Sequence, residues 1–457
     1  MMVKYVVFNH FFSLSTKPTC LFIYELNELK LQYYKNLEYS IEKTQVNMTK
    51  IAITLTVISL ITGSSVFVVG TYFMDPCPAP CRCLKFGGLQ SVYCNQTGVR
   101  AVPEGIPANT QLLDLSFNSI SHIRVGDLAY LGNLQQLYLS QNELTETSLD
   151  ERALDLPSLV TIDLSSNNFK TIPTFLPRGL QTLWFLNNQI EVLRTGAFER
   201  YSSILYLDVS NNGMMAIQPE AFAPLTSLQT LYISFNNLTD TSFPPNLFAK
   251  NTNLTHLSLR FNQLTSLLLN LPVSLEYLDY VGNAIRTLPA YGFTSLPSLK
   301  AMEFWQGQIT SIEDFAFYGL PNVEILDFMQ CQISSALTKN TFAGLSGLTT
   351  IYLDINQISQ IQPGAFHPLT SLTNLWMSGN NLTTLEPEVL DAKDVANLST
   401  LYIDFNPWEC DCQLRWLREG MDNATYVIQD PHLIKCASPP KLAGKSWDEL
   451  KPGDFVC

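Results

Sequence analysis

The segment LQTLYISFNNL at residues 228–238 decides the fold. It fits the pattern L-x-x-L-x-L-x-x-N-x-L, and this pattern returns along the chain with successive spacings between 21 and 26 residues. Thirteen positions align with the asparagine of the pattern: Asn118, Asn142, Asn167, Asn188, Asn212, Asn236, Asn262, Asn283, Gly307, Cys331, Asn356, Asn380 and Asn406. A period of this length predicts a solenoid of thirteen stacked repeats, because one unit cannot bury its own leucines.

Each unit is expected to form a short strand, to turn sharply and to return along the outer side. The asparagine amide has two donors and one acceptor, so it can satisfy backbone groups of adjacent turns in a buried corner. A second periodic signal marks the return path. Its phenylalanines, which we expect to form a stacked column in the core, are Phe198, Phe222, Phe293, Phe317, Phe342 and Phe366.

Two clusters of four cysteines flank the repeats. The first reads Cys77-x3-Cys81-x-Cys83-x10-Cys94, and the second reads Cys410-x-Cys412-x23-Cys436-x20-Cys457. The open ends of a solenoid would expose core leucines, so they need atypical capping units. Clustered cysteines indicate an oxidising compartment, and the sequence alone allows three pairings in each cluster. Cys331 stands apart at a ladder position and is interpreted as a buried free thiol.

These repeats and clusters resemble the extracellular leucine-rich repeat family over residues 77–457. The resemblance implies a horseshoe-shaped solenoid with a curved parallel β-sheet on its concave face, an irregular or short-helical convex face and a disulfide cap at each end. It also implies the pairs Cys77–Cys83, Cys81–Cys94, Cys410–Cys436 and Cys412–Cys457. The alternation of short and long repeats is similar to that of small leucine-rich proteoglycans, and the segment CASPPKLAGKSW resembles chondroadherin-like proteins.

The division of the chain follows from these signals. Residues 51–70 form a long uncharged apolar run after Met48-Thr49-Lys50. We interpret residues 48–70 as a signal peptide, with a signal anchor as the alternative. Residues 1–47 then represent a gene-model extension or a disordered segment. The remaining ranges are a cysteine-rich N-terminal cap (71–103), the repeats (104–408) and a cysteine-rich C-terminal cap (409–457).

Composition restricts the function. Of the 457 residues, 46% are hydrophobic, and this fraction excludes a disordered chain. The formal net charge of −13 argues against nucleic acid as a partner. No membrane insertion of the mature chain is expected. The five histidines stand far apart, and the motifs of hydrolases, metalloproteases and phosphate-binding loops are absent. The sequence therefore predicts a non-catalytic protein that needs no metal or cofactor.

The concave face is predicted to carry the binding surface. In L-x-x-L-x-L, the residue between the last two leucines faces outward, and twelve of the thirteen residues in that column are acidic or aromatic. Together with Trp305, two places further along its strand, the predicted ligand-binding residues are Asp114, Tyr138, Asp163, Trp184, Asp208, Tyr232, Asp279, Glu303, Trp305, Asp327, Tyr352, Trp376 and Tyr402. Asp354 is expected to extend the same surface. Aromatic side chains are typical of binding hot spots, and acidic ones steer a basic partner.

The expected function is that of a secreted protein of the extracellular matrix or space that binds a protein ligand. The resemblance implies a matrix protein such as collagen, or a cell-surface receptor, and homodimerisation through the concave face would compete with binding. The alternative is the ectodomain of a cell-surface adhesion or innate-recognition receptor truncated at residue 457. Six N-x-[ST] sequons predict glycosylation at Asn95, Asn237, Asn253, Asn381, Asn397 and Asn423, with Asn253 and Asn397 expected to be shielded beside the strands.

Overall fold

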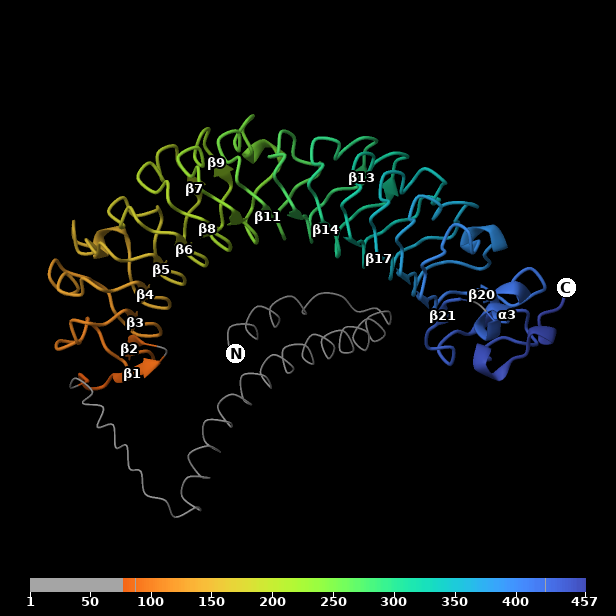
Figure 1. The fold of residues 1–457 in the computed structure, drawn as a ribbon, viewed down its shortest axis with the longest axis horizontal. Helices are drawn as coiled ribbons and strands as arrows, with labels where there is room; N and C mark the ends of the chain where they lie inside the picture. The colour runs from red at the N-terminus through yellow and green to blue at the C-terminus, as the bar shows by residue number, and fades with distance from the viewer. Residues whose placement is uncertain (1–76, 87, 424) are drawn as a thin grey trace, which may run out of the picture. The chain divides into compact units, whose positions relative to one another are not determined.

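The computed structural model describes residues 77–86, 88–423 and 425–457, which belong to one compact unit, Met74–Cys457. The expectations for the extension and the signal segment lie outside the described residues. Within this unit the repeats stack side by side into an arc, with one strand of each repeat on the inner side (Figure 1). The leucine-rich repeat solenoid is therefore confirmed as the fold class.

A single sheet of sixteen strands runs through the described residues. β1 and β2 form an antiparallel hairpin, and each later pair of neighbours is parallel. The strands, in their order in the sheet, are β1 (Arg82–Phe86), β2 (Leu89–Tyr93), β3 (Leu112–Asp114), β4 (Gln136–Tyr138), β5 (Thr161–Asp163), β6 (Thr182–Trp184), β8 (Tyr206–Asp208), β10 (Thr230–Tyr232), β11 (His256–Ser258), β12 (Tyr277–Asp279), β14 (Ala301–Glu303), β16 (Ile325–Asp327), β17 (Thr350–Tyr352), β18 (Asn374–Trp376), β19 (Thr400–Tyr402) and β21 (Val427–Ile428).

The return segments carry only short elements. Two pairs of two-residue strands lie on the outer side of the arc: β7 (Val192–Leu193) with β9 (Ala216–Ile217), and β13 (Thr287–Leu288) with β15 (Ser311–Ile312). Three 3-10 helices, η2 (Glu146–Ser148), η3 (Asp240–Ser242) and η4 (Pro387–Leu390), also lie in return segments. The C-terminal cap adds β20 (Trp408–Glu409), β22 (Cys436–Ser438), α3 (Arg415–Asn423), η5 (Trp447–Glu449) and η6 (Pro452–Asp454).

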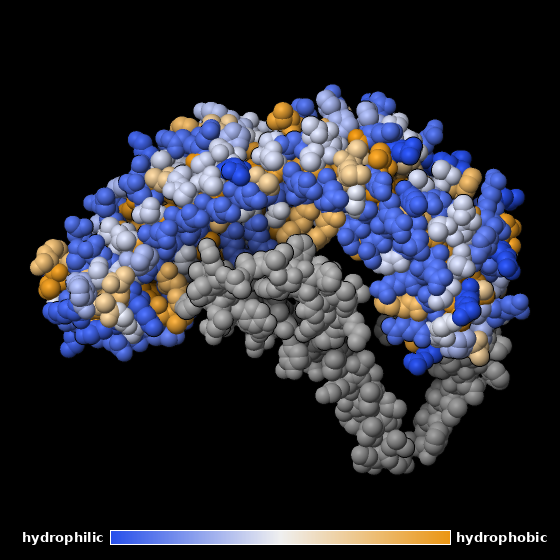
Figure 2. Space-filling view, turned by 180° about the vertical axis from the view of Figure 1, so that it is seen from behind, coloured by the Kyte–Doolittle hydropathy of each residue, from blue (hydrophilic) through white to orange (hydrophobic). Residues whose placement is uncertain are grey.

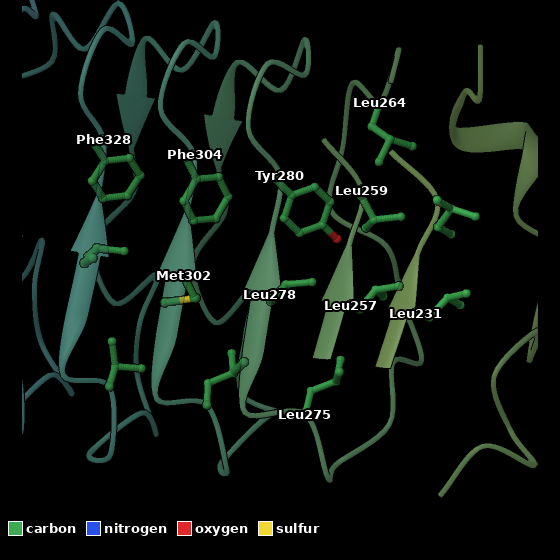
Figure 3. Close-up of a cluster of buried hydrophobic side chains, with 14 of the residues drawn as sticks. Leu231, Leu257, Leu259, Leu264, Leu275, Leu278, Tyr280, Met302, Phe304 and Phe328 are labelled. Carbon is green, nitrogen blue, oxygen red and sulfur yellow. The ribbon is translucent and has the colours of Figure 1, made fainter. Parts of the chain in front are cut away.

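The core lies between the inner strands and the outer returns. Leu207, Leu231 and Leu257 are paired in register as the central residues of β8, β10 and β11, and none of them is exposed. Because successive side chains of a strand point to opposite faces, the residues on either side of each leucine point away from the core. Figure 3 shows one section of this core, in which Tyr280, Phe304 and Phe328 follow β12, β14 and β16 as a second layer.

The predicted phenylalanine column is confirmed. Phe198 stacks on Phe222 with ring centroids 6.1 Å apart, and Phe222 stacks on Phe248 at 5.7 Å. After a gap at the next repeat, the column continues through Phe293, Phe317, Phe342 and Phe366 at spacings of 5.9, 6.4 and 6.0 Å. All of these rings are buried, so seven repeats each contribute one ring to a core shared with their neighbours.

The asparagine ladder also forms as predicted. The Asn236 amide nitrogen donates to the carbonyls of Val209, Ile233 and Ser234, while its oxygen accepts from the N–H groups of Asn212 and Met214. The residue before each ladder position has a positive φ, as at Phe235 (54°), which is how the chain turns sharply where each strand ends. This conformation is costly for non-glycine residues, and the ladder bonds on either side hold it in place.

Two consecutive ladder positions lack the amide. At Gly307, a Cβ atom would lie 2.7 Å from the carbonyl oxygen of Phe304, so only glycine fits without a shift. At the next position, Cys331 is free and buried, and its thiol donates to the same carbonyl at 3.2 Å. This confirms the interpretation of Cys331 as a buried free thiol, and burial raises the pKa of the thiol to about 12.

Each end of the stack is closed by two disulfides. Cys77–Cys83 and Cys81–Cys94 tie the segment before β1 to the β1–β2 hairpin, which joins the first repeat through the pairing of β2 with β3, and Cys410–Cys436 and Cys412–Cys457 close the other end. These are the four pairs that the family resemblance implies. In the C-terminal cap the buried side chains of Trp408 and Trp447 cover the last leucines. None of the helices in the described part of the chain has the length and apolarity needed to cross a membrane.

Candidate ligand-binding face

Three columns of side chains point outward from the inner strands and define what we call the concave face. The middle column consists of the last residue of each strand from β3 to β19, and it contains twelve of the thirteen predicted binding residues. The first column lies two residues earlier in each strand and the third column two residues later. Trp305 belongs to the third column. Parallel strands in register align equivalent positions, so the twelve middle-column residues lie side by side.

Aromatic rings form a continuous row across the first half of the concave face, which we call the N-terminal aromatic row. Tyr138 stacks on Trp184 with centroids 6.1 Å apart, Trp184 meets Tyr206 edge-on at 6.0 Å, and Tyr206 lies 5.5 Å from Tyr232. All four side chains are only partly buried. The row thus presents large, rigid surfaces with polar tips, which are the properties of hot-spot residues.

A second group of rings, the C-terminal aromatic row, lies on β17, β18 and β19. Tyr352 and Trp376 are 5.6 Å apart, and Trp376 stacks on Tyr402 with a centroid distance of 3.5 Å and an interplanar angle of 10°. The Asp404 carboxylate in the third column accepts a hydrogen bond from the Ser378 hydroxyl beside these rings. The concave face therefore has two aromatic rows separated by the strands β11 to β16.

The aspartates of the middle column have a structural role that the sequence analysis did not assign. In Asp114, Asp163, Asp208 and Asp327, one carboxylate oxygen accepts the backbone N–H two residues further on, at 2.8 to 2.9 Å. These N–H groups lie where each strand ends. Aspartate in this column thus completes the strand through a bond from the backbone to its own side chain.

A charged cluster occupies the centre of the concave face. Arg260 pairs with both Asp279 and Glu303, with 2.6 Å between its Nη2 and Glu303 Oε2, and its guanidinium lies 5.7 Å from the centroid of Trp305. The Tyr277 hydroxyl donates to Glu303 at 2.7 Å. Although burial acts to lower it, the two carboxylates hold the pKa of Arg260 above its usual range. The guanidinium therefore stays charged and fixes these side chains together.

The prediction that Asp279 and Asp354 are exposed on the concave face is wrong. Asp279 is 1% exposed, because Arg260 reaches across from the adjacent strand and covers it, so its carboxylate does not face a ligand. Asp354 is 5% exposed, and its carboxylate accepts the backbone N–H of Ser378 at 3.1 Å. Glu303 and Trp305 remain partly exposed beside the covered Asp279.

The sequence analysis missed three side chains of this face. Tyr206 and Tyr277 stand in the first column, and Arg260 stands in the third. The signal was present, because strand residues alternate between faces and all three have the same parity as the middle column. The prediction covered the middle column, whereas Tyr206, which lies between Trp184 and Tyr232, belongs to the first column.

The buried carboxylates predict an unusual pH dependence of stability. Burial raises the pKa of Asp208, Asp279 and Asp404 above that of a free aspartate, to about 6 for Asp279. The folded chain then binds protons more tightly than the unfolded chain between the unfolded pKa near 3.8 and these raised values. The free energy of unfolding therefore increases as the pH falls through this window. We expect a higher Tm at pH 5 than at pH 7 by scanning calorimetry.

Replacement of one of these carboxylates tests the cause. Asp208→Asn keeps an acceptor for the Ser210 N–H but removes the charge, so the rise in Tm between pH 7 and pH 5 should become smaller. The matched control is Asp155→Asn, at an exposed carboxylate paired with Arg152 on the surface. A wild-type Tm that falls between pH 7 and pH 5, or an identical profile for Asp208→Asn, would contradict the assignment.

The sequons lie on the surface of the described chain where their side chains can be placed. Asn95, Asn237, Asn253, Asn381 and Asn397 are all exposed, whereas the side chain of Asn423 lies outside the described part. The expectation that Asn253 and Asn397 are shielded is wrong. Each donates a hydrogen bond from its amide nitrogen to a carbonyl of the preceding repeat, Thr226 and Thr370 respectively, but remains accessible.

The fold, the ladder and the capped ends define a leucine-rich repeat protein, and comparison with known proteins agrees. A family model described as leucine rich repeat matches residues 178–238, 297–358, 330–382 and 346–407, and a second leucine-rich repeat model matches residues 227–251. Biglycan of Sus scrofa is 30% identical over 190 residues, which cover 36% of this chain and 68% of biglycan. The chain therefore belongs to the leucine-rich repeat family and is related to the small leucine-rich proteoglycans.

Podocan of Mus musculus is also similar, with 30% identity over 225 residues that cover 48% of this chain and 33% of podocan. The chain spans less than half the length of the first curated relatives it matches. Podocan and biglycan are secreted, non-enzymatic matrix proteoglycans. Among solved structures, the octameric complex of Latrophilin 3, Unc5D and FLRT2 contains a similar chain, with a TM-score of 0.56, 23% identity and coverage of 82% of this chain and 98% of the other. That likeness concerns the fold alone.

Proposed function

We propose that this chain is a non-catalytic extracellular protein that binds a protein ligand through its concave face. The observation that carries the proposal is the N-terminal aromatic row, in which four rings from four strands lie in successive contact, with centroids 5.5 to 6.1 Å apart. Rings held by their neighbours lose little conformational entropy when a ligand covers them. Such a surface suits a large partner that crosses several strands.

The charge of the face supports a basic ligand. Asp114, Asp163 and Asp208 alternate with the rings of the N-terminal aromatic row, and the one arginine of the central strands is already paired with two carboxylates. An acidic surface of this kind accelerates encounter with a positively charged partner. Collagen, another matrix protein or a cell-surface receptor would each provide an extended surface with basic residues.

Two further features support a location outside the cytoplasm. Four disulfides close the caps, and such bonds persist in oxidising compartments. The related matrix proteoglycans are secreted. We accordingly propose secretion into the extracellular matrix or space, with glycans at the six sequons and no catalytic activity. A cell-surface ectodomain would use the same concave face and differ in how the chain is attached.

The test removes the largest ring of each aromatic row. We expect the double variant Trp184→Ala/Trp376→Ala to bind immobilised fibrillar collagen at least tenfold more weakly than the wild type by surface plasmon resonance, because hot-spot truncations each weaken binding by about 1–2 kcal/mol or more. Its Tm should stay near that of the wild type, since both rings stand outside the core. The matched control is Tyr130→Ala/Phe175→Ala, which removes two exposed rings of the return segments.

The outcomes separate the partner from the face. Equal collagen binding by the wild type and the double variant would contradict the concave face as the binding surface. Absence of collagen binding by the wild type would exclude collagen. The wild type and the double variant would then be compared for binding to cell surfaces. Binding by the wild type that is lost in the double variant supports a receptor partner.

A further inference from the structure

The two short repeats of 21 residues offer a comparison within one molecule. The first runs from Asn167 to Asn188 and the second from Asn262 to Asn283. Both follow a 3-10 helix with nearly the same sequence, TETS at residues 145–148 and TDTS at 239–242. In both, the acidic residue of that helix accepts two successive backbone N–H groups of the short repeat. Their backbones are therefore built in the same way, and differences between them come from side chains.

The first short repeat is closed on its return side. Ile172 is 4% exposed and Pro173 is buried. The hydroxyl of Tyr201, from the following repeat, accepts the Leu176 N–H at 3.1 Å and donates to the Pro173 carbonyl. The positions that point outward carry Thr174 and Arg178. These two positions are polar, whereas the ring of Phe175 between them is 47% exposed.

The second short repeat is open at the same place. Leu296 stands where the first has Tyr201, so the hydroxyphenyl ring of the following repeat that covers the first loop is absent here, and Leu267 and Leu268 are only partly buried. A groove of about 640 Å³ results, with Phe243, Leu267, Leu268 and Pro289 among its lining residues. Figure 3 shows Tyr280 beside Leu259 and Leu264 in the core below; its hydroxyl accepts the Leu268 N–H at 2.9 Å. The volume lies in the range of small-ligand sites.

The loop of the second short repeat exposes two aliphatic residues. Leu269, which lines the groove, is 82% exposed, and Val273, four residues further along the same loop, is 66% exposed. The equivalent positions of the first short repeat hold Thr174 and Arg178, which shows that the shared backbone accepts polar residues there. Exposed apolar side chains around a groove are typical of an interaction site.

The charges around the groove differ from those around the first short repeat in both directions, since Arg178 and Arg194 correspond to Val273 and Pro289, while three acidic positions are lost. Asp150, Glu151 and Glu191 of the first repeat are replaced by Pro244, Pro245 and Arg286 in the second. Arg286 is exposed, and it takes part in none of the ion pairs found within the described residues. The one carboxylate in the lining, Asp240, is occupied by its bonds to Thr265 and Ser266.

We propose that this groove binds a long-chain carboxylate, with the hydrocarbon chain along Leu267, Leu268 and Leu269 and the carboxylate paired with Arg286. Apolar walls favour burial of a methylene chain, and a single cation at the rim favours an anionic head group. The chain as a whole is strongly acidic, so a groove with one cation and two prolines in place of three acidic positions is a local exception. This site is independent of the concave face and of the proposed function.

The test uses dodecanoate with the full-length secreted protein, by isothermal titration calorimetry at concentrations below micelle formation. We expect one saturable site in the wild type and at least tenfold weaker binding in Leu269→Thr/Val273→Arg, which transfers the residues of the first short repeat. Arg286→Glu, also taken from the first short repeat, should lose dodecanoate binding and bind dodecylamine instead. The variants change exposed side chains, so an unchanged Tm confirms that they are folded.

The matched control places the same residues where the groove is closed. Thr174→Leu/Arg178→Val should create no second site, because Tyr201 still ties down the first short repeat. The proposal is overturned by absence of saturable binding, by equal binding of dodecanoate and dodecylamine to the wild type, or by equal binding in Leu269→Thr/Val273→Arg. A wild-type dimer in sedimentation velocity that this double variant converts to a monomer would also overturn it, and would assign the groove to a second copy of the chain.

Discussion

Replacement of Phe222 by alanine is expected to lower the free energy of unfolding by about 3–5 kcal/mol, because it opens a cavity in the middle of a close-packed column. The Phe222 ring is fully buried and stacks on Phe198 and Phe248, whose planes lie within 17° and 13° of its own. Phe198 belongs to the repeat before that of Phe222, and Phe248 belongs to the repeat after it. The cavity therefore weakens two interfaces at once, and the loss of stability should appear as a large fall in Tm and in the midpoint of urea unfolding.

A matched phenylalanine on the surface provides the control. Phe175 is 47% exposed in a return segment, and Phe175→Ala should leave the urea midpoint nearly unchanged. If the two variants unfold at the same urea concentration, the column does not hold the repeats together as described. A Phe222→Leu variant should recover much of the lost stability, since it restores most of the buried volume.

The second large effect is expected from a ladder asparagine. Asn236→Ala removes an amide that bonds five backbone groups, all within the buried corner between repeats. The N–H groups of Asn212 and Met214 lose their acceptor, and each unsatisfied buried group costs about 1–3 kcal/mol. We therefore expect a loss of about 3 kcal/mol or more in the free energy of unfolding, measured by urea denaturation.

An adjacent asparagine separates this effect from a general effect of substitution. Asn211 precedes the ladder position of the same repeat, is exposed, and donates one side-chain bond to Asn187 at 3.0 Å. Because Asn211 has a φ of 52°, glycine is the substitution that removes its side chain without backbone strain, and Asn211→Gly should change stability by less than about 1 kcal/mol. A similar loss in both variants would mean that the buried amide is no more important than a surface hydrogen bond.

The local and repeated features of this protein could be predicted from the sequence. Leucine spacing, the ladder position and the phenylalanine of the return path each depend on contacts between equivalent residues of adjacent repeats, so one aligned unit describes all of them. Strand parity likewise places Tyr138, Trp184 and Tyr232 in the column where the structure has them. To predict these features, one does not need to know the orientation of any long side chain.

Features that depend on one particular neighbour could not be predicted in this way. Asp279 has the correct parity for an exposed residue, but the long side chain of Arg260 on the adjacent strand covers it. The groove at the second short repeat depends on Leu296 standing where the first has Tyr201, a difference of one hydroxyphenyl ring between distant segments. An alignment of the repeats hides such single-residue differences. These differences nevertheless determine where one repeat departs in structure from the others.

The interruption of the ladder at Gly307 and Cys331 has a mechanical consequence. Elsewhere each amide acts as a short tie between successive turns and resists their separation. The side-chain tie is missing at Gly307, between β12 and β14, and is reduced to a single thiol bond at Cys331, between β14 and β16, so the stiffness of the arc is expected to be lowest from β12 to β16. Bending should concentrate there, and the arc can then open or close its radius while the segments on either side keep their own curvature. The two aromatic rows lie on opposite sides of this point, so such bending would change the distance between them and let one solenoid fit ligands of different widths.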